Sequence, residues 1–212
     1  MKLTKREHSC LLLEMSGDTL IIDPGSFTLP LEDARGVVAI VITHEHPDHW
    51  TPEHLRRILD VNPDARILGP AGVAAAATEF DVRVVAAGDA LEVGNFALRF
   101  FGGKHAEIHR SIPIIDNVGV LVNEELYYAG DSYSIPDGVE VGTLAVPAGA
   151  PWLKIGEVID YVSAVKPKRS FPVHEMVLSV AGKGMSNGRI EAETTKHGGQ
   201  FFALEPGESI DL

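Results

Sequence analysis

The stretch THEHPDHW, residues 43–50, places three histidines and one aspartate within six consecutive positions. It follows the aliphatic run VVAIVI, residues 37–42, which predicts a buried strand. Pro47 disfavours helical geometry at the residue before it, so the chain should stay extended through His46. In an extended segment residues two apart face the same side, and we therefore expect His44 and His46 to point together.

The second half of the stretch leads into a predicted helix at residues 51–60, with Thr51 as N-cap and Pro52 at its first position. Asp48 and His49 lie in the turn before this helix and can aim at a different point from the first two histidines. Two pairs of ligand side chains favour a site for two metal ions, provided that later segments complete the coordination of each ion. The alternative interpretation of this stretch is a hydrated surface turn.

Strand and helix patterns alternate along the rest of the chain. Runs of β-branched and aliphatic residues predict strands or strand-rich segments at residues 10–15, 19–25, 37–43, 65–70, 82–88, 90–103, 117–122, 126–132, 143–149, 169–174 and 200–205. Helices are predicted at residues 71–80, 154–165 and 189–197, and the last of these follows a polar stretch that includes GKGMSNG. NEE at 123–125 predicts a hairpin turn. This alternation predicts an α/β fold. Because no linker or repeat interrupts it, we expect one domain over residues 1–212.

Composition narrows the expected partners and location. The formal net charge of −12 disfavours nucleic acid and anionic membranes as partners. The apolar runs are too short to span a membrane, which takes roughly 20 residues. A single cysteine, Cys10, and a charged N-terminal stretch agree with a cytoplasmic protein. A small-molecule substrate is therefore the expected partner, and the sequence leaves open a homo-oligomer.

The motif HEHPDH resembles the H-x-H-x-D-H signature of the metallo-β-lactamase superfamily. Four further segments resemble this family in the same order along the chain, namely IIDPG (21–25), GGKHAEIH (102–109), YYAGDS (127–132) and FPVHE (171–175). The resemblance implies a four-layer αβ/βα sandwich, the metallo-β-lactamase fold, with a binuclear metal site at one edge of its two sheets.

The resemblance also implies a role for each motif residue. His44, His46 and His105 would hold the first ion, and the second would be held by Asp48, His49 and His174. Asp131 would bridge both ions. Zinc is the expected metal, and manganese or iron accept similar ligands.

Other residues near these motifs are candidates for supporting roles. Asp23 is expected to accept a hydrogen bond from a ligand imidazole and so orient it. Candidates for contact with the substrate are His109, Tyr133, Lys104 and Arg110. His8 lies in an HSC motif that resembles one near the N-terminus of some superfamily members, and the sequence assigns it no role.

The implied chemistry is hydrolysis by a water that two cations activate. Asp48 and Asp131 would act in catalysis by orienting that water, and the bond cleaved would be an ester, lactone, thioester or phosphoester. The chain resembles the subgroup of ascorbate-phosphate lactonases and uncharacterised metal-dependent hydrolases, so we predict a small, anionic substrate. The alternatives are a phosphodiesterase or nuclease of the same fold and a metal-binding module without catalysis.

Overall fold

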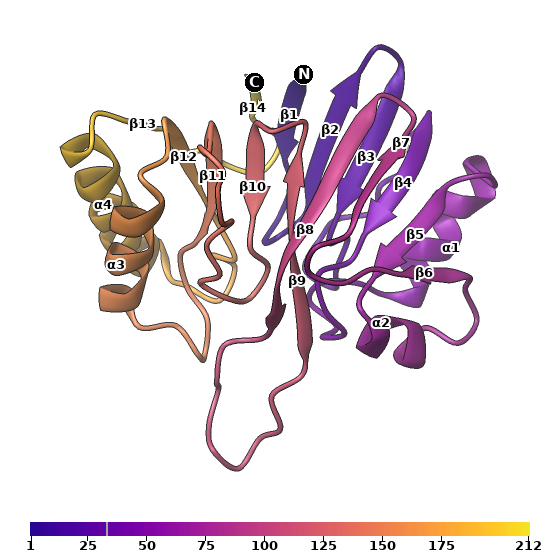
Figure 1. The fold of residues 1–212 in the computed structure, drawn as a ribbon, viewed down its shortest axis with the longest axis horizontal. Helices are drawn as coiled ribbons and strands as arrows, with labels where there is room; N and C mark the ends of the chain where they lie inside the picture. The colour runs from indigo at the N-terminus through magenta and orange to yellow at the C-terminus, as the bar shows by residue number, and fades with distance from the viewer. Residues whose placement is uncertain (33) are drawn as a thin grey trace.

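The structure is a computed structural model that describes residues 1–32 and 34–212. Within these residues the strands form two seven-stranded sheets (Figure 1). The first sheet has the spatial order β14 (Ser209–Asp211), β1 (Lys2–Lys5), β2 (Leu11–Met15), β3 (Asp18–Ile22), β4 (Val37–Val41), β5 (Arg66–Gly69), β6 (Val82–Val84). The second sheet has the order β13 (Gln200–Phe201), β12 (Arg169–Val173), β11 (Thr143–Pro147), β10 (Leu126–Tyr128), β9 (Asp116–Val122), β8 (Phe96–Lys104), β7 (Ala90–Val93).

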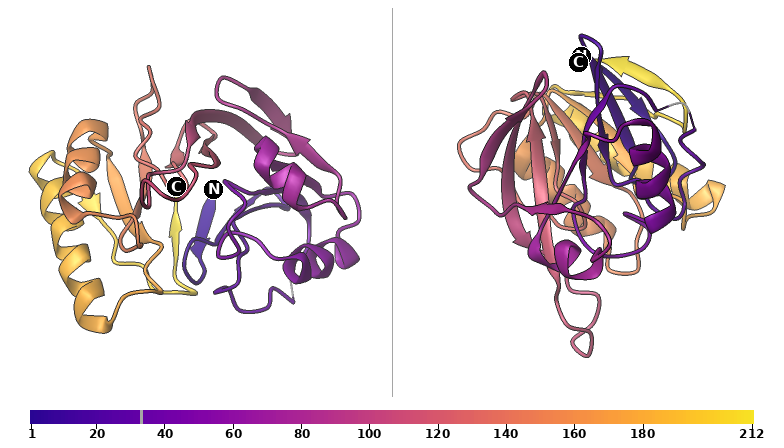
Figure 2. Two further views of the ribbon diagram at one scale, coloured as in Figure 1. Left: turned by 90° about the horizontal axis from the view of Figure 1, so that it is seen from below. Right: turned by 90° about the vertical axis from the view of Figure 1, so that its right-hand side faces the viewer.

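Helices cover the outer face of each sheet, and the inner faces of the sheets pack on each other (Figure 2). Helices α1 (Pro52–Val61) and α2 (Ala71–Ala76) lie against the first sheet, and α3 (Ile155–Val165) and α4 (Val180–Lys196) lie against the second. The core between the sheets contains Leu13, Leu20, Val41, Phe96, Phe100, Val120 and Phe171. Burying each such side chain contributes about 1.5–3 kcal/mol. The predicted four-layer αβ/βα sandwich is confirmed.

Local signals in the sequence place several elements where they were expected. Thr51 caps α1 by accepting a hydrogen bond from the His54 backbone N–H at 3.2 Å. Asn123 and Glu124 adopt positive φ values of 51° and 52° between β9 and β10, which confirms the predicted hairpin turn.

The helix predicted at residues 189–197 is wrong in its start, because α4 begins at Val180 and includes the glycine-rich stretch. Ser179 caps it by accepting a hydrogen bond from the Gly182 N–H at 3.1 Å. Ile190 and Thr194 are fully buried on its inner side, and Thr194 hydrogen-bonds Ser170 of β12 at 2.7 Å. Packing on the second sheet thus outweighs the low helix propensity of glycine.

The two ends of the chain lie side by side in the first sheet, which the sequence analysis did not predict (Figure 1). Strand β14 pairs antiparallel with β1, and the Leu212 N–H donates to the Met1 carbonyl at 2.7 Å. Both strands are short and lie at opposite ends of the sequence, so no local sequence pattern predicts their pairing.

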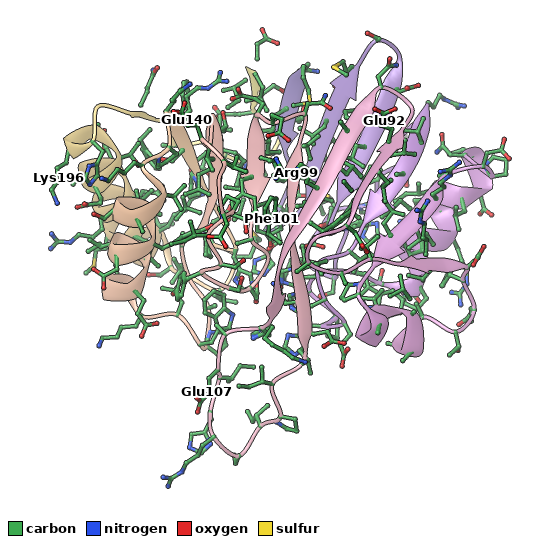
Figure 3. The ribbon with its side chains drawn as sticks, in the orientation of Figure 1. Glu92, Arg99, Phe101, Glu107, Glu140 and Lys196 are labelled. Carbon is green, nitrogen blue, oxygen red and sulfur yellow. The ribbon has the colours of Figure 1, made fainter. Side chains whose placement is uncertain are left out.

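A long loop joins β8 to β9 and projects from the sandwich. Figure 3 shows Glu107 on this loop, away from the body of the protein. Residues 109–114 are exposed. Of the helices in the described part of the chain, none combines the length and apolar character needed to cross a membrane.

Candidate metal centre

The loop after β4 carries the first group of candidate ligands. His44 and His49 are fully buried, whereas His46 and Asp48 are half-buried and face the solvent side. A turn closed by the His49 N–H and the His46 carbonyl, 3.0 Å apart, separates the two pairs. Gly25 lies directly against this turn, and a Cβ atom there would sit 1.8 Å from the Asp48 carbonyl oxygen. The close approach of these segments therefore requires glycine.

Strands of the second sheet bring the remaining candidates to the same place. His105 follows β8, Asp131 follows β10 and His174 follows β12. The Asp131 carboxylate lies 3.4 Å from His105 Nε2 and 3.1 Å from His174 Nε2. It also lies 3.3 Å from Nε2 of His49, which belongs to the loop of the first sheet. Asp131 thus stands at the centre of the cluster.

The donor atoms form groups that match the sequence-based grouping. One group is His44, His46 and His105; another is Asp48, His49 and His174, joined by His8; a third is His44, His49 and Asp131. Within each group the donor atoms lie within 4.8 Å of one another. A cation about 2.1 Å from each donor holds its donors roughly 3.4 Å apart in tetrahedral geometry. The structure therefore brings together all seven predicted ligands.

Four buried atoms at the centre of this cluster fit a bound cation. They are His49 Nε2, His105 Nε2, His174 Nε2 and Asp131 Oδ1, and among the described residues none of them has a partner in hydrogen-bonding orientation, although they approach one another. Leaving a buried polar atom without a partner costs about 1–3 kcal/mol. Imidazole nitrogen and carboxylate oxygen are also zinc ligands. The residues present thus fit divalent metal ions.

Backbone carbonyls orient two of the imidazoles. His174 Nδ1 lies 2.6 Å from the Gly149 carbonyl oxygen, and His105 Nδ1 lies 2.6 Å from the Ala106 carbonyl oxygen. A carbonyl can only accept a hydrogen bond, so in both rings Nδ1 carries a proton and donates it. In the neutral form of each ring, Nε2 then keeps its lone pair towards the cluster.

Asp23 orients a third imidazole, as the sequence suggested. Its Oδ2 lies 2.7 Å from His49 Nδ1 and also accepts the Thr43 hydroxyl at 2.7 Å. Its Oδ1 accepts the Thr43 backbone N–H at 2.8 Å. Both oxygens of this buried carboxylate therefore have hydrogen-bond partners. Through these contacts Asp23 joins the end of β3 to the loop that carries the first group of candidate ligands.

The carboxylates set the charge of the imidazoles around them. Burial alone would lower the pKa of His174, but Asp131 outweighs it and raises that pKa to about 9. Burial is likewise outweighed at His49, where Asp131 and Asp23 raise the pKa well above its usual value. By contrast, burial and the nearby His49 lower the pKa of His44 and keep it neutral. A cation held by His49 and His174 would displace the protons from their Nε2 atoms.

Backbone and side-chain contacts hold Asp131 in place. Its backbone N–H donates to Asn117 Oδ1 at 3.0 Å. Gly130 has a φ of 65°, and a Cβ atom there would lie 2.3 Å from Asn117 Oδ1 and 2.8 Å from the Thr43 Cβ. Glycine is therefore required before the aspartate.

Trp152 is a functional candidate that the sequence analysis missed. Its indole Nε1–H donates to Asp131 Oδ2 at 2.8 Å. The residue is 8% exposed, and its ring lies edge-on to His105, with centroids 5.8 Å apart. No spacing rule connects a tryptophan in a loop to an aspartate 21 positions earlier, so only the fold reveals this contact.

We expect Trp152→Phe to weaken metal binding while the protein stays folded. Phenylalanine keeps the aromatic packing but removes the N–H that holds Asp131 Oδ2, and losing such a partner typically costs about 10-fold or more in metal affinity. Zinc titration against a competing chelator measures the change. Tyr127→Phe is the control, because it removes a buried donor to the Ser134 carbonyl, 2.9 Å away, outside the cluster. Unchanged zinc affinity in Trp152→Phe would contradict the role of the indole.

The four candidates for substrate contact lie at the periphery. His109 and Arg110 are exposed on the projecting loop, and His109 Nδ1 lies 2.7 Å from the Ser111 hydroxyl. Lys104 pairs with Asp116 at 2.8 Å. Tyr133 packs behind Trp152, with ring centroids 5.4 Å apart. Substrate contact by these residues stays a prediction.

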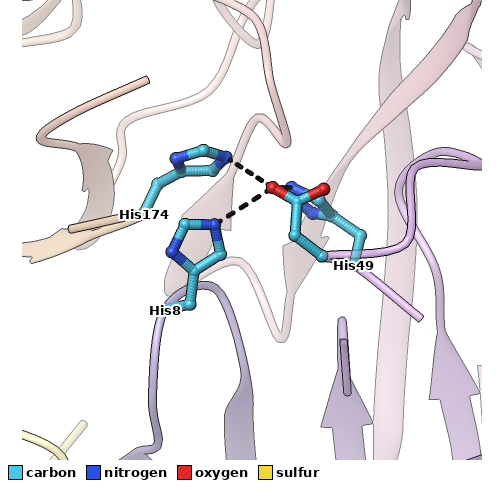
Figure 4. Close-up of side chains that lie close together, drawn as sticks. His8, His49 and His174 are labelled. Carbon is cyan, nitrogen blue, oxygen red and sulfur yellow. Dashed lines mark hydrogen bonds and ion pairs between the residues drawn. The ribbon is translucent and has the colours of Figure 1, made fainter. Parts of the chain in front are cut away.

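His8 joins the second group of donors, although the sequence assigned it no role. Its Nε2 lies 3.2 Å from Asp48 Oδ2, and His174 Nε2 lies 3.4 Å from the same oxygen. Figure 4 shows the His8 and His174 rings directed towards one carboxylate beside His49.

Comparison with known proteins places this arrangement in a family. Residues 2–174 match the family described as Beta-lactamase superfamily domain. Protein Rv0786c of Mycobacterium tuberculosis is 40% identical over 99% of this chain and 98% of its own length. A UPF0173 metal-dependent hydrolase of Aeropyrum pernix is 27% identical over 100% of this chain and 97% of its own length.

A solved structure shows the same fold. Igni18, a metallo hydrolase of the archaeon Ignicoccus hospitalis, superposes with a TM-score of 0.74 at 18% sequence identity and covers 99% of this chain and 97% of its own. At this identity the likeness concerns the fold alone. The family match over residues 2–174, most of the chain, shows that the protein belongs to the metallo-β-lactamase superfamily.

Proposed function

We propose that the protein is a metal-dependent hydrolase that holds two divalent cations, most simply zinc, and cleaves an ester, lactone or phosphoester of a small anionic molecule. The observation that carries this proposal is the convergence, at the centre of the cluster, of four buried metal-donor atoms that have no hydrogen-bond partner among the described residues. His44, His46 and His105 would hold one ion, and Asp48, His49 and His174 the other, with Asp131 between them.

When bound, two such cations would lower the pKa of a water towards neutrality and polarise a carbonyl or phosphoryl oxygen. The protein's own groups determine how that water is oriented. Burial opposes ionisation of Asp48, but the rings of His174 and His8 outweigh it and hold the pKa of Asp48 well below its usual range. The carboxylate therefore stays ionised at neutral pH and can accept a hydrogen bond from an attacking water. With so low a pKa it suits orienting the water better than removing its proton.

The different exposure of the candidate ligands supports one direction of approach for the substrate. Asp48 has a side chain 27% exposed and His46 is half-buried, whereas Asp131 and His174 have side chains at most 3% exposed. The substrate would thus enter over Asp48 and His46, beside the loop that carries Arg110. Contact between Arg110 on that loop and an anionic group of the substrate stays a prediction.

Metal analysis followed by an assay panel tests the proposal. We expect about two zinc ions per chain, and hydrolysis of at least one member of a panel of lactones, phosphodiesters, thioesters and single-stranded RNA. Removing the metal with a chelator should abolish turnover, and zinc should restore it. His46→Ala should lose both metal and turnover, with exposed His197→Ala as the matched control. Full metal content and turnover in His46→Ala would refute the site, and cleavage of RNA alone would refute the small-molecule substrate.

A further inference from the structure

His8 is a fully buried histidine in the turn between β1 and β2. Its ring lies 3.9 Å from that of His174, measured between centroids, and its Nε2 lies 3.2 Å from Asp48 Oδ2. Judged by distance alone, His8 could be another metal ligand or a hydrogen-bond partner of Asp48. The contacts of its other atoms decide between these roles.

His8 connects the two sheets at the edge where the metal cluster lies. The turn that carries it belongs to the first sheet, yet its carbonyl oxygen accepts the His174 backbone N–H of the second sheet at 3.0 Å. A second contact links the same two segments, because buried Lys5 of β1 forms an ion pair with buried Glu175, the residue after His174. His8 and His174 also both adopt left-handed backbone conformations, with φ of 62° and 61°. Such conformations persist where the surroundings hold them.

The remaining ring nitrogen of His8 identifies its tautomer. The Met176 backbone N–H donates to His8 Nδ1 at 3.4 Å. An imidazole nitrogen that accepts a hydrogen bond carries no proton, and the neutral ring must then carry its proton on Nε2. Nε2–H therefore donates to Asp48 Oδ2 and has no lone pair for a cation.

We propose that His8 is a positioning residue, which holds Asp48 in the orientation that the second metal ion needs and does not itself bind the ion. The inference rests on the proposed function, because it concerns the same two-ion site. Asp48 is more exposed than Asp131, so without a hydrogen-bond partner its side chain could rotate towards solvent. The hydrogen bond from His8 keeps Oδ2 beside His174, and the link to the 174–176 segment keeps His8 itself in place.

Two variants of His8 separate the hydrogen bond from the space that the ring fills. His8→Leu removes the donor, and we expect the weaker of two zinc-binding steps to lose about 10- to 100-fold in affinity while the other step is unchanged. His8→Gln places an amide N–H near the position of Nε2 and should recover most of the loss. His54→Leu is the control, because His54 is also buried and hydrogen-bonds a carbonyl, that of Thr28, outside the cluster.

Nitrogen-15 NMR of the zinc-loaded wild-type protein tests the tautomer directly and does not depend on a variant that folds. We expect a proton on His8 Nε2 and none on Nδ1. A zinc-bound Nε2 would overturn the inference, as would His8→Leu protein that binds two zinc ions with wild-type affinity. In both cases the wild-type protein still binds two ions, so the proposed function stands. Wild-type protein that binds no zinc would overturn the proposed function and this inference with it.

Discussion

Asp131→Asn protein is expected to lose at least one of the two proposed metal ions and, with it, hydrolytic turnover. The carboxylate lies among Nε2 atoms of His49, His105 and His174 at 3.1–3.4 Å and is 2% exposed. A neutral amide cannot supply charge to two cations at once. Because losing even an indirect partner of a ligand costs about 10- to 100-fold in metal affinity, the loss here should be at least about 100-fold.

Metal content after dialysis and zinc titration measure this effect, and turnover on the substrate found in the panel should fall in parallel. Asp89→Asn is the matched control, since exposed Asp89 accepts a hydrogen bond from the Ala86 backbone N–H at 2.9 Å and belongs to none of the groups of candidate ligands. The same substitution there should leave metal content unchanged. If Asp131→Asn kept two tightly bound ions and normal turnover, the central place of Asp131 would be wrong.

Asp23→Asn should reverse the tautomer of the neutral His49 ring and so weaken zinc binding about 10- to 100-fold. Asp23 accepts two donors from Thr43 and faces His49 Nδ1 at 2.7 Å. Asparagine can still accept the Thr43 backbone N–H with its oxygen, but its amide group then presents N–H to His49 Nδ1. That nitrogen must now accept, the ring proton moves to Nε2, and the lone pair that would bind metal is lost. In other enzymes that pair a buried aspartate with histidine, this exchange lowers kcat by about 10⁴-fold through the same reversal.

Nitrogen-15 NMR of His49 and zinc titration of the same sample check both parts of this expectation. Asp18→Asn is the control, because half-buried Asp18 also accepts two hydrogen bonds, both from Asn95, at 2.7 and 2.8 Å. Chemical denaturation should show a folded Asp23→Asn protein. An unchanged His49 tautomer together with wild-type zinc affinity would show that Asp23 does not orient the ring.

Local rules in the sequence account for the part of the site that lies on one segment. Pro47 predicted that two pairs of side chains separate within six residues, and the turn between His46 and His49 has this effect. The resemblance to a family supplied the distant members His105, Asp131 and His174. The structure brings all of them together, while their binding of metal stays a prediction.

Sequence patterns are misleading where long-range contacts override local propensity. Helix α4 begins at Val180 and not near residue 189, because burial of Ile190 and Thr194 against the second sheet outweighs its glycines. Strands β1 and β14 have four and three residues and stabilise each other across the chain. Patterns within a short window carry no information about such partners.

Residue types and their spacing are enough to predict the layered α/β architecture and the kind of donor atoms at the site. Both depend on residue type and on periodicity along one segment. Only the tertiary structure decided which ring nitrogens keep a lone pair, that Trp152 holds Asp131, and that His8 faces Asp48. Each of these depends on the single donor or acceptor that a side chain meets from a distant strand, and that partner exists only once the two sheets have packed.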